Sequence, residues 1–216
     1  MIGAITHSFD RLSVTDYAAA VAEFTRTAQY LTLRRPYLLT TYKPVVELLR
    51  FLEDNGFSCH IVSGGDRDFM RPIVQRCYGI PPERVIGSAL GVRYESTIGD
   101  VRYGSSFEFM DNGPEKPARI WCRIGRCPLF TAGNSDGDAQ MLDYLLAGHR
   151  PGFALVVHHD DRIRDAASND IGAHTVLGEA SSRGYTVASV QHDWATVFGA
   201  PDQPGQRMHY HLGLRK

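Results

Sequence analysis

The sequence predicts a protein of the α/β class, a three-layer sandwich in which helices cover both faces of a mainly parallel sheet. Short apolar segments alternate along the chain with segments of helical periodicity, and this order is typical of parallel strands joined by crossover helices. Polar residues and glycines also follow several of the strand-like segments directly. Ligands of such sheets bind at the carboxyl ends of the strands, so these polar residues are candidates for a functional site.

The first elements are predicted to be helices. Residues 13–31 carry apolar side chains at helical spacing, and Ser13 or Thr15 can cap the start of this helix. Residues 43–56 predict a second helix with Pro44 in its first turn and a glycine at its end. These two helices precede the first predicted strand of the sheet.

The remaining two thirds of the chain predict alternating strands and helices. Strands are expected at 57–65, 84–90, 128–134, 153–159 and 186–190, and helices at 67–79, 116–125 and 139–148. Residues 92–109 alternate between polar and apolar side chains around "STIGDVRYG", which predicts a hairpin or flap.

Composition excludes several classes of protein. The formal net charge is -1 and no block of Lys and Arg is present, so we expect neither a nucleic-acid partner nor a membrane partner. No apolar run approaches the ~20 residues of a membrane span. The segment "MIGAITHSFDRLS" does not resemble a secretory signal, which favours a cytoplasmic location. The cysteines form no CxxC pair, and we expect reduced, packed thiols.

Two candidate groups for anion binding lie near strand ends. Ser63, Gly64 and Gly65 follow a strand-like segment and precede a helix, so their hydroxyl and backbone N–H groups could bind an anion. Lys116 lies in the Gly/Pro-bounded loop "DNGPEKP" before another strand. Each has an ordinary alternative when taken alone: a Ser-Gly turn for the first and a solvated lysine for the second.

The turn "NSDGD" is the strongest local signal. Asn134, Asp136 and Asp138 supply the hard oxygen atoms that Mg²⁺ or Ca²⁺ prefers. A calcium loop of the EF-hand type would need Gly and Glu where Ala139 and Leu145 stand, so that interpretation fails. A solvated acidic turn remains the alternative, although it does not explain why an apolar strand leads into the turn.

Histidines form a third group of candidates. His158 and His159 follow a strand and would point to opposite sides of it, so they are poorly placed to share one metal. We interpret them as structural or rim residues. His209 and His211 could share one face of a strand, but a polar tail without structure is the favoured interpretation of this region.

Taken together, "IVSGGDRDFM", the lysine of "GPEKP" and "AGNSDGDAQML" resemble motifs two, three and four of the haloacid dehalogenase-like (HAD) hydrolase superfamily. The most similar branch is that of the phosphoserine-phosphatase-like hydrolases. The resemblance covers most of the chain and implies a Rossmann-like fold. It also implies a Mg²⁺-dependent phosphatase that acts on a small phosphate monoester through an aspartyl-phosphate.

The resemblance also implies a role for each matched residue. Ser63 would hydrogen-bond a phosphoryl oxygen with the help of Gly64, and Lys116 would stabilise the phosphate and the nucleophile. Asn134 and Asp138 would hold Mg²⁺, with Asn134 at a position where many members have Asp. Asp136 would be an extra carboxylate behind the metal ligands.

The implied domains follow the same pattern. Residues 1–42 would form a partial helical cap, in which Arg35 is a weak candidate for a substrate contact. Residues 43–200 would form the α/β core, with the flap near 92–109 at the edge of the site. Residues 201–216 would form a polar tail.

The sequence departs from the family at its first motif, a strand that ends in Asp-x-Asp-x-Thr and carries the nucleophile. The carboxylates before Ser63 are Asp10, Asp16, Glu23, Glu47, Glu53 and Asp54. None follows an apolar strand with a second Asp two residues away, and Asp10 is the nearest approach. We therefore expect an N-terminally truncated hydrolase, through a misassigned start codon, an expression boundary or a truncated gene. A catalytically inactive pseudo-enzyme that binds a phosphorylated ligand or a partner protein is the alternative.

The absent motif has a consequence for the sheet. In the family this strand lies between the strand that ends at Ser63 and the strand that ends near Gly133. Without it, two facing edges would keep unpaired N–H and C=O groups, which recruit other strands. We therefore expect insertion of "MIGAIT" as a poor substitute, direct pairing of the two edges, or self-association of the chain.

Overall fold

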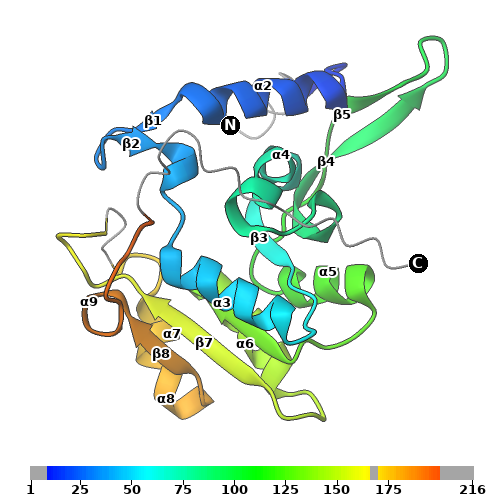
Figure 1. Ribbon diagram of the computed structural model, residues 1–216. Helices are drawn as coiled ribbons and strands as arrows, with labels where there is room; N and C mark the ends of the chain where they lie inside the picture. Colours follow the sequence, from blue (N-terminus) through cyan, green and yellow to red (C-terminus); the bar gives the residue numbers. More distant parts are fainter. Residues whose placement is uncertain (1–8, 166–169, 200–216) are drawn as a thin grey trace.

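The computed structural model describes residues 9–165 and 170–199 and confirms the α/β class. Figure 1 shows the α2 helix (Val14–Thr27) across the upper part of the molecule, with most of the strands and other helices below it. No helix in the described part of the chain is both long and apolar enough to cross a membrane. The predicted tail at 201–216, with His209 and His211, lies outside the described residues.

The strands form three separate sheets rather than one mainly parallel sheet. In the first, β3 (Ile61–Asp66) pairs in parallel with β4 (Val85–Glu95), and β4 pairs in antiparallel with β5 (Asp100–Phe109). In the second, β6 (Phe130–Gly133), β7 (Phe153–His158) and β8 (Thr186–Ser189) are parallel. A two-stranded antiparallel sheet joins β1 (Gln29–Tyr30) to β2 (Arg35–Pro36).

The described strands therefore form no single continuous sheet, and β3 and β6 each keep an edge without a described partner. Among the described residues, β3 and β6 do not pair with each other, and no strand lies between them to join their two sheets by hydrogen bonds. Direct closure of the two edges, one of the three outcomes expected from the sequence, is not observed.

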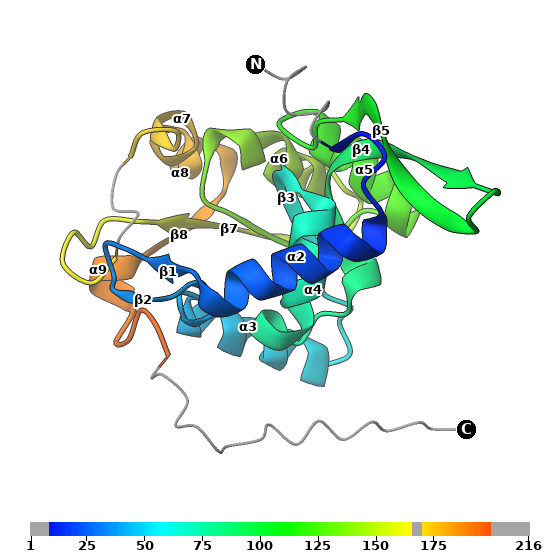
Figure 2. The same ribbon diagram turned by 90° about the horizontal axis from the view of Figure 1, so that it is seen from above.

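The α2 helix confirms the first predicted helix and its cap, but it ends at Thr27, so the prediction was wrong for Gln29–Tyr30, which form β1. The hydroxyl oxygen of Ser13 accepts a hydrogen bond from the Thr15 amide at 3.2 Å, which satisfies one of the free N–H groups at the helix start. The helix packs against α4 (Arg67–Tyr78), as Figure 2 shows. The second predicted helix is α3 (Lys43–Asp54), followed by a positive-φ glycine as expected.

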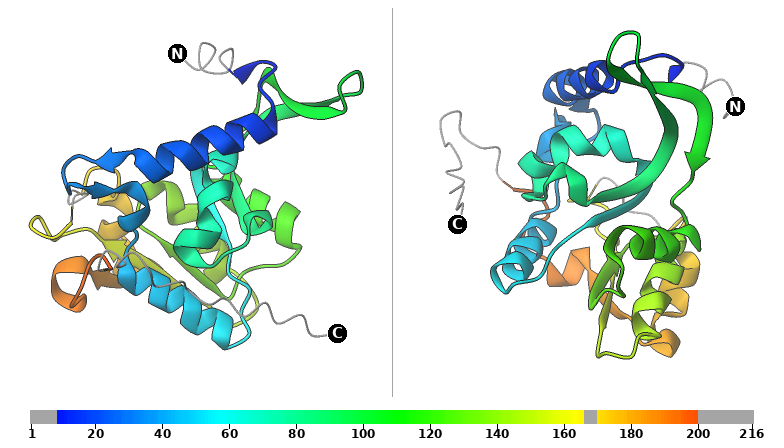
Figure 3. Two further views of the ribbon diagram at one scale, coloured as in Figure 1. Left: turned by 45° about the horizontal axis from the view of Figure 1, so that its top comes forward. Right: turned by 90° about the vertical axis from the view of Figure 1, so that its right-hand side faces the viewer.

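The predicted flap is confirmed as the β4–β5 hairpin. Its register pairs Val92 with Tyr103 and Tyr94 with Val101. The tip extends beyond the rest of the molecule in Figures 1 and 3, and its base is fixed by Tyr103, whose buried ring packs edge-to-face on Phe9. The flap is therefore anchored at its base and exposed at its tip.

Two apolar clusters join the first sheet to the second. Ile61 of β3 lies in a cluster with Leu52 of α3 and Phe130 of β6. The next residue, Val62, lies in a cluster with Ile120 of α5 (Glu115–Ile124) and with Met141 of α6 (Ala139–Leu146). Because consecutive strand residues point to opposite faces, α3 and α5 cover opposite faces of β3.

The other short elements complete the fold. They are α7 (His174–Gly178), α8 (Ala180–Arg183), α9 (Val190–Asp193), and the 3₁₀ turns η1 (Tyr37–Leu39), η2 (Pro82–Arg84) and η3 (Asp136–Asp138). All four cysteines are free, as expected from the sequence. Cys59 is buried, which raises the pKa of its thiol to about 11, whereas Cys122 is exposed and is therefore not a packed thiol.

Candidate functional site

The loop from Asp111 to Lys116 brings the end of β3 and the turn after β6 together. The Ser88 hydroxyl donates a hydrogen bond to the Gly64 carbonyl at 2.7 Å and accepts one from the Asp111 amide at 2.9 Å. On the other side of the loop, the Gly113 amide donates to the Gly137 carbonyl at 3.1 Å. Groups far apart in the sequence therefore meet at the carboxyl ends of two parallel strands.

This close approach depends on two glycines. A Cβ atom on Gly137 would lie 2.2 Å from the side-chain oxygen of Asn112, and one on Gly133 would lie 2.5 Å from the Cβ atom of Asp138. Contacts this short are sterically forbidden. The glycines of "AGNSDGD" thus allow the loop and the Asp138 side chain to pack against the turn.

Lys116 and Asp138 form a buried ion pair at this junction. Lys116 lies in the first turn of α5, and its Nζ atom is 2.5 Å from Oδ1 of Asp138. The two residues are 4% and 5% exposed. Charges buried this deeply require a partner, and each residue supplies it for the other. The structure thereby brings together two of the residues singled out from the sequence.

The other oxygen of Asp138 fixes the turn itself. Oδ2 accepts hydrogen bonds from the amide of Asn134 at 2.9 Å and from the amide and hydroxyl of Ser135 at 3.0 and 2.9 Å. A carboxylate offers about four acceptor positions, and Asp138 meets four donors. This is a capping box at η3, a structural role that the spacing of Ser135 and Asp138 could have revealed.

These contacts bear on the predicted magnesium ligands. Asn134 is exposed, whereas the acceptor positions of Asp138 are engaged by protein donors. Within residues 9–165 and 170–199, no group of three or more His, Cys, Asp or Glu side chains is arranged to hold a metal. The assignment of Asn134 and Asp138 as magnesium ligands stays a prediction.

Asp111 is a second buried carboxylate in this site and is not among the site residues predicted from the sequence. It is 0% exposed, and neither of its carboxylate oxygens has a hydrogen-bond partner in the described part of the protein. Burial raises the pKa of the Asp111 carboxyl, against the opposing effects of Lys116, of Arg119 and of the nearby Ser63 backbone amide. Its place directly before the Asn-Gly turn of the lysine loop is the only signal in the sequence.

The charges of the three buried side chains do not cancel. Lys116 contributes one positive charge, and Asp111 and Asp138 contribute one negative charge each when ionised, which leaves a net charge of about −1. A buried negative charge repels an anionic ligand and attracts a cation. Both carboxylate oxygens of Asp111 lack a hydrogen-bond donor among the described residues and so keep free lone pairs.

The anion site expected at Ser63 differs in its geometry. Gly64 and Gly65 belong to β3, and α4 begins only at Arg67. Asp66 caps that helix by accepting a hydrogen bond from the Asp68 amide at 2.9 Å, so a carboxylate already occupies the helix start. The two glycines therefore lie just before the helix rather than in its first turn, and their contact with an anion stays a prediction.

Ser63 itself keeps a donor for a ligand. It is half-buried, and its Oγ atom accepts a hydrogen bond from the Gly65 amide at 3.1 Å. A hydroxyl that accepts one hydrogen bond can still donate its own proton. Because Gly64 lies against the Asp111 carbonyl oxygen and the Asn112 side chain, Ser63 is close to the loop that carries Lys116.

Asp136 has a structural contact that the sequence did not predict. Its carboxylate accepts a hydrogen bond from the Val176 amide at 2.8 Å, and its own amide donates to the Gly172 carbonyl at 2.6 Å. Asp136 thus holds the start of α7 against the turn. These contacts do not test the prediction that Asp136 lies next to the metal ligands without binding the metal itself.

The histidines after β7 have different partners. His158 contacts Asp170 through Nε2 at 2.8 Å, and His159 contacts Asp165 through Nδ1 at 2.6 Å. The Tyr42 hydroxyl also donates to Asp165, at 2.9 Å. The two histidines therefore contact different carboxylates, which agrees with their interpretation as structural or rim residues.

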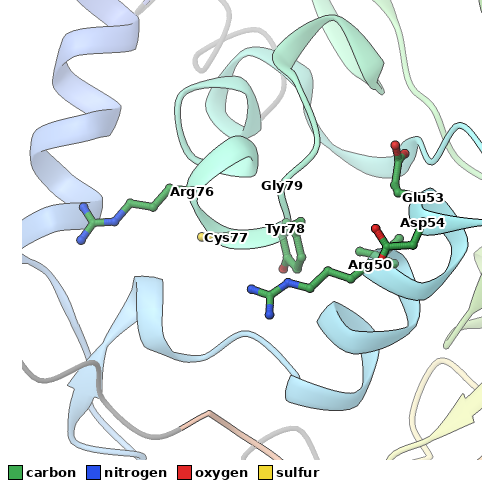
Figure 4. Close-up of a pocket in the computed structure, with 8 residues that line it drawn as sticks. Arg50, Glu53, Asp54, Arg76, Cys77, Tyr78 and Gly79 are labelled. Carbon is green, nitrogen blue, oxygen red and sulfur yellow. The ribbon is translucent and has the colours of Figure 1, made fainter. Parts of the chain in front are cut away.

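Two other features lie apart from these contacts. The Arg35 guanidinium stacks over the Phe198 ring, with Cζ 5.4 Å from the ring centroid. An open pocket of about 210 Å³ lies between α3 and the end of α4. Figure 4 shows its lining, which includes Arg50 and Arg76 and none of the site residues predicted from the sequence.

Comparisons with known proteins identify no family. The sequence matches no protein-family model and no curated protein. Among solved structures, the chain is similar to the crystal structure of a phosphoserine phosphohydrolase-like protein from Francisella tularensis subsp. tularensis SCHU S4. The TM-score is 0.39 and the identity 16%, over 65% of this chain and 57% of that chain. The chain thus spans a little over half the length of that structure. At this low similarity the match says nothing about function, which must be argued from the site residues.

Proposed function

We propose that this chain carries the site of a HAD-like hydrolase of the magnesium-dependent phosphatase type, for a small phosphate monoester. The observation that supports the proposal is the buried ion pair of Lys116 and Asp138. The loop that carries Lys116 is also linked to the strand of Ser63 by hydrogen bonds through the Ser88 hydroxyl. The three motifs that resemble the family in sequence therefore meet in space. A coincidental set of turns would not need to converge on one lysine.

Each residue has a role that its contacts allow. The Ser63 hydroxyl donates to a phosphoryl oxygen, and the Gly64 backbone approaches the same group. The Lys116 ammonium stabilises the negative charge of the phosphate. Selectivity for phosphate over other anions comes from this pairing of a hydroxyl with a fixed buried cation.

Magnesium fits the charge of the site. With a net charge of about −1 on the buried side chains, a phosphate dianion would be repelled without an added cation. Asn134 and Asp138 would hold the ion, and the orphaned Asp111 carboxylate would add oxygen and charge beside it. When bound, Mg²⁺ neutralises phosphate charge during transfer.

A second candidate function is binding of a phosphorylated ligand without turnover. It is favoured by the state of the two carboxylates beside Lys116, since Asp138 is engaged by four donors and Asp111 is fully buried. Covalent phosphoryl transfer needs a carboxylate that is free to attack. We therefore expect the 216-residue chain to hydrolyse monoesters far more slowly than the ordinary ~1–10³ s⁻¹.

Calorimetric titration with inorganic phosphate, with and without Mg²⁺, tests the shared part of both candidates. We expect binding that requires Mg²⁺ and that weakens about 10-fold in Ser63→Ala, because one hydrogen bond to a charged group is lost. Ser58→Ala removes an exposed hydroxyl near the same strand and should leave binding unchanged. A p-nitrophenyl phosphate assay then separates turnover from binding. Absence of phosphate binding in the wild type would contradict both candidates.

A further inference from the structure

The loop from Asp111 to Lys116 carries one more polar side chain, that of Asn112. This residue is exposed, and its carboxamide makes no hydrogen bond within the part of the chain that the structure describes. Asp111 and Lys116 are both buried, so the loop turns its charged groups inward and presents the Asn112 carboxamide to solvent. A carboxamide with no protein partner is available to a ligand.

The Asn112 side chain lies between the two elements that carry the site. A Cβ atom on Gly64 would lie 3.8 Å from Oδ1 of Asn112, so the side chain adjoins the strand end that carries Ser63. A Cβ atom on Gly137 would lie 2.2 Å from the same oxygen, and Gly137 belongs to η3, the turn that follows Asn134. A ligand that contacts both Ser63 and Asn134 would therefore lie close to the Asn112 carboxamide.

The backbone on both sides of Asn112 is fixed. The Asn112 amide donates to the Met110 carbonyl at 3.0 Å, and the Asn112 carbonyl accepts from the Glu115 amide at 3.3 Å. The next residue, Gly113, donates to the Gly137 carbonyl at 3.1 Å and has a φ of 59°, which glycine adopts without strain. A side chain on a backbone held in this way loses less freedom when a ligand binds, which favours binding.

The chemistry of a carboxamide suits a phosphate at this place. Nδ2 of Asn112 offers two N–H donors and carries no charge. The oxygen Oδ1 rests against Gly137, whereas Nδ2 would lie farther from a Cβ atom there, at 3.6 Å. A hydrogen bond from this nitrogen to a charged phosphoryl oxygen is stronger than one between two neutral groups.

We propose that Asn112 is a further ligand-binding residue of this site, and that its Nδ2 atom donates a hydrogen bond to an oxygen of the bound phosphoryl group. The inference rests on the proposed function, because it adds a contact to the phosphate that Ser63 and Lys116 bind. It also accounts for the glycine at position 137. Gly137 is not among the glycines with positive φ, so the space taken by the Asn112 carboxamide, rather than the backbone conformation, excludes a side chain there.

Calorimetric titration of the full chain with inorganic phosphate in the presence of Mg²⁺ tests this contact. Asn112→Ala removes the carboxamide, and we expect the Kd to rise about 10-fold, because one hydrogen bond to a charged group is lost. Asn112→Asp keeps the shape of the side chain but replaces the donor with an acceptor, so the Kd should rise at least as much. Gln75→Ala removes an exposed carboxamide on α4 and should leave the Kd unchanged.

The placement of Asn112 against Gly137 is tested without any ligand. Gly137→Ala should lower the free energy of unfolding of the wild type, because the added methyl group meets the Asn112 side chain. In an Asn112→Ala background the methyl group has room, so the same change should cost much less. Urea denaturation of the wild type, the two single variants and the double variant measures this coupling. Additive effects would overturn the placement.

The outcomes separate this inference from the proposed function. A higher Kd in both Asn112 variants, together with coupling to Gly137, supports the inference. If the wild type binds phosphate and either Asn112 variant has an unchanged Kd, Asn112 is not a donor to the ligand, and the site of Ser63 and Lys116 stands without it. If the wild type binds no phosphate, the proposed function is overturned and the role of Asn112 with it.

Discussion

The lysine loop, Asp111 to Lys116, and the turn from Asn134 to Asp138 each contribute one buried carboxylate, and the two carboxylates are in opposite states. Asp138 meets four hydrogen-bond donors, including Lys116, whereas Asp111 meets none among the described residues. Both are at most 5% exposed. A buried carboxylate that meets donors on both oxygens stabilises the fold, while one that meets none destabilises it until a ligand, cation or proton arrives.

The largest expected effect is at Asp138. Asp138→Asn removes the carboxylate that is hydrogen-bonded to Lys116 and leaves the buried ammonium without its ion-pair partner. Breaking one partner of a buried pair costs about 3–5 kcal/mol, so we expect the free energy of unfolding to fall by about that amount. Urea denaturation at neutral pH measures it.

Asp54→Asn is the matched control, because Asp54 is exposed and should change stability by less than about 0.5 kcal/mol. If Asp138→Asn cost no more than this control, the buried pair would not exist in solution. Asp138 could then no longer be called a carboxylate that stabilises the fold through its partners.

Asp111→Asn should have a smaller effect of opposite sign. Burial raises the pKa of the Asp111 carboxyl in the folded state above the ~3.9 of an unfolded chain. The folded state then binds more protons, so stability falls as pH rises from about 4 through the folded-state pKa. The amide carries no charge, and we expect Asp111→Asn to stabilise the protein by about 1 kcal/mol at pH 7.

This advantage should vanish below about pH 4, where the carboxyl is neutral in both states. Thermal melts of wild type and Asp111→Asn across the range from pH 3.5 to about 7.5 would measure it. A variant that is less stable than the wild type at neutral pH would show instead that the Asp111 carboxylate already has a partner in solution.

Local features of the fold were predictable from the sequence. The Ser13 cap of α2, the glycine stop of α4 at Gly79 and the hairpin at 92–109 follow from side chains within a few residues of each other. Gly79 adopts a φ of 74°, the left-handed conformation that glycine favours. The convergence of Lys116 and Asp138 was predictable only through the resemblance, since no local rule joins them.

Features that depend on long-range pairing were not predictable. Ser63-Gly64-Gly65 has the composition of a turn, yet β3 continues to Asp66 because Asp66 is paired with Ser88 of β4. The orphaned state of Asp111 depends on where Ser88 and Gly64 hold its backbone. Such partners are distant in sequence, and neither periodicity nor spacing encodes them.

The most direct test of the account is a titration with inorganic phosphate in the presence of Mg²⁺, followed by the amide resonances of the protein. We expect the largest shifts at the amides of Ser63, Gly64 and Asn134, and we expect these shifts to be lost without Mg²⁺. Shifts confined to the pocket of Arg50 and Arg76, or no shifts at the strand ends, would contradict the claim that these residues form a phosphate site.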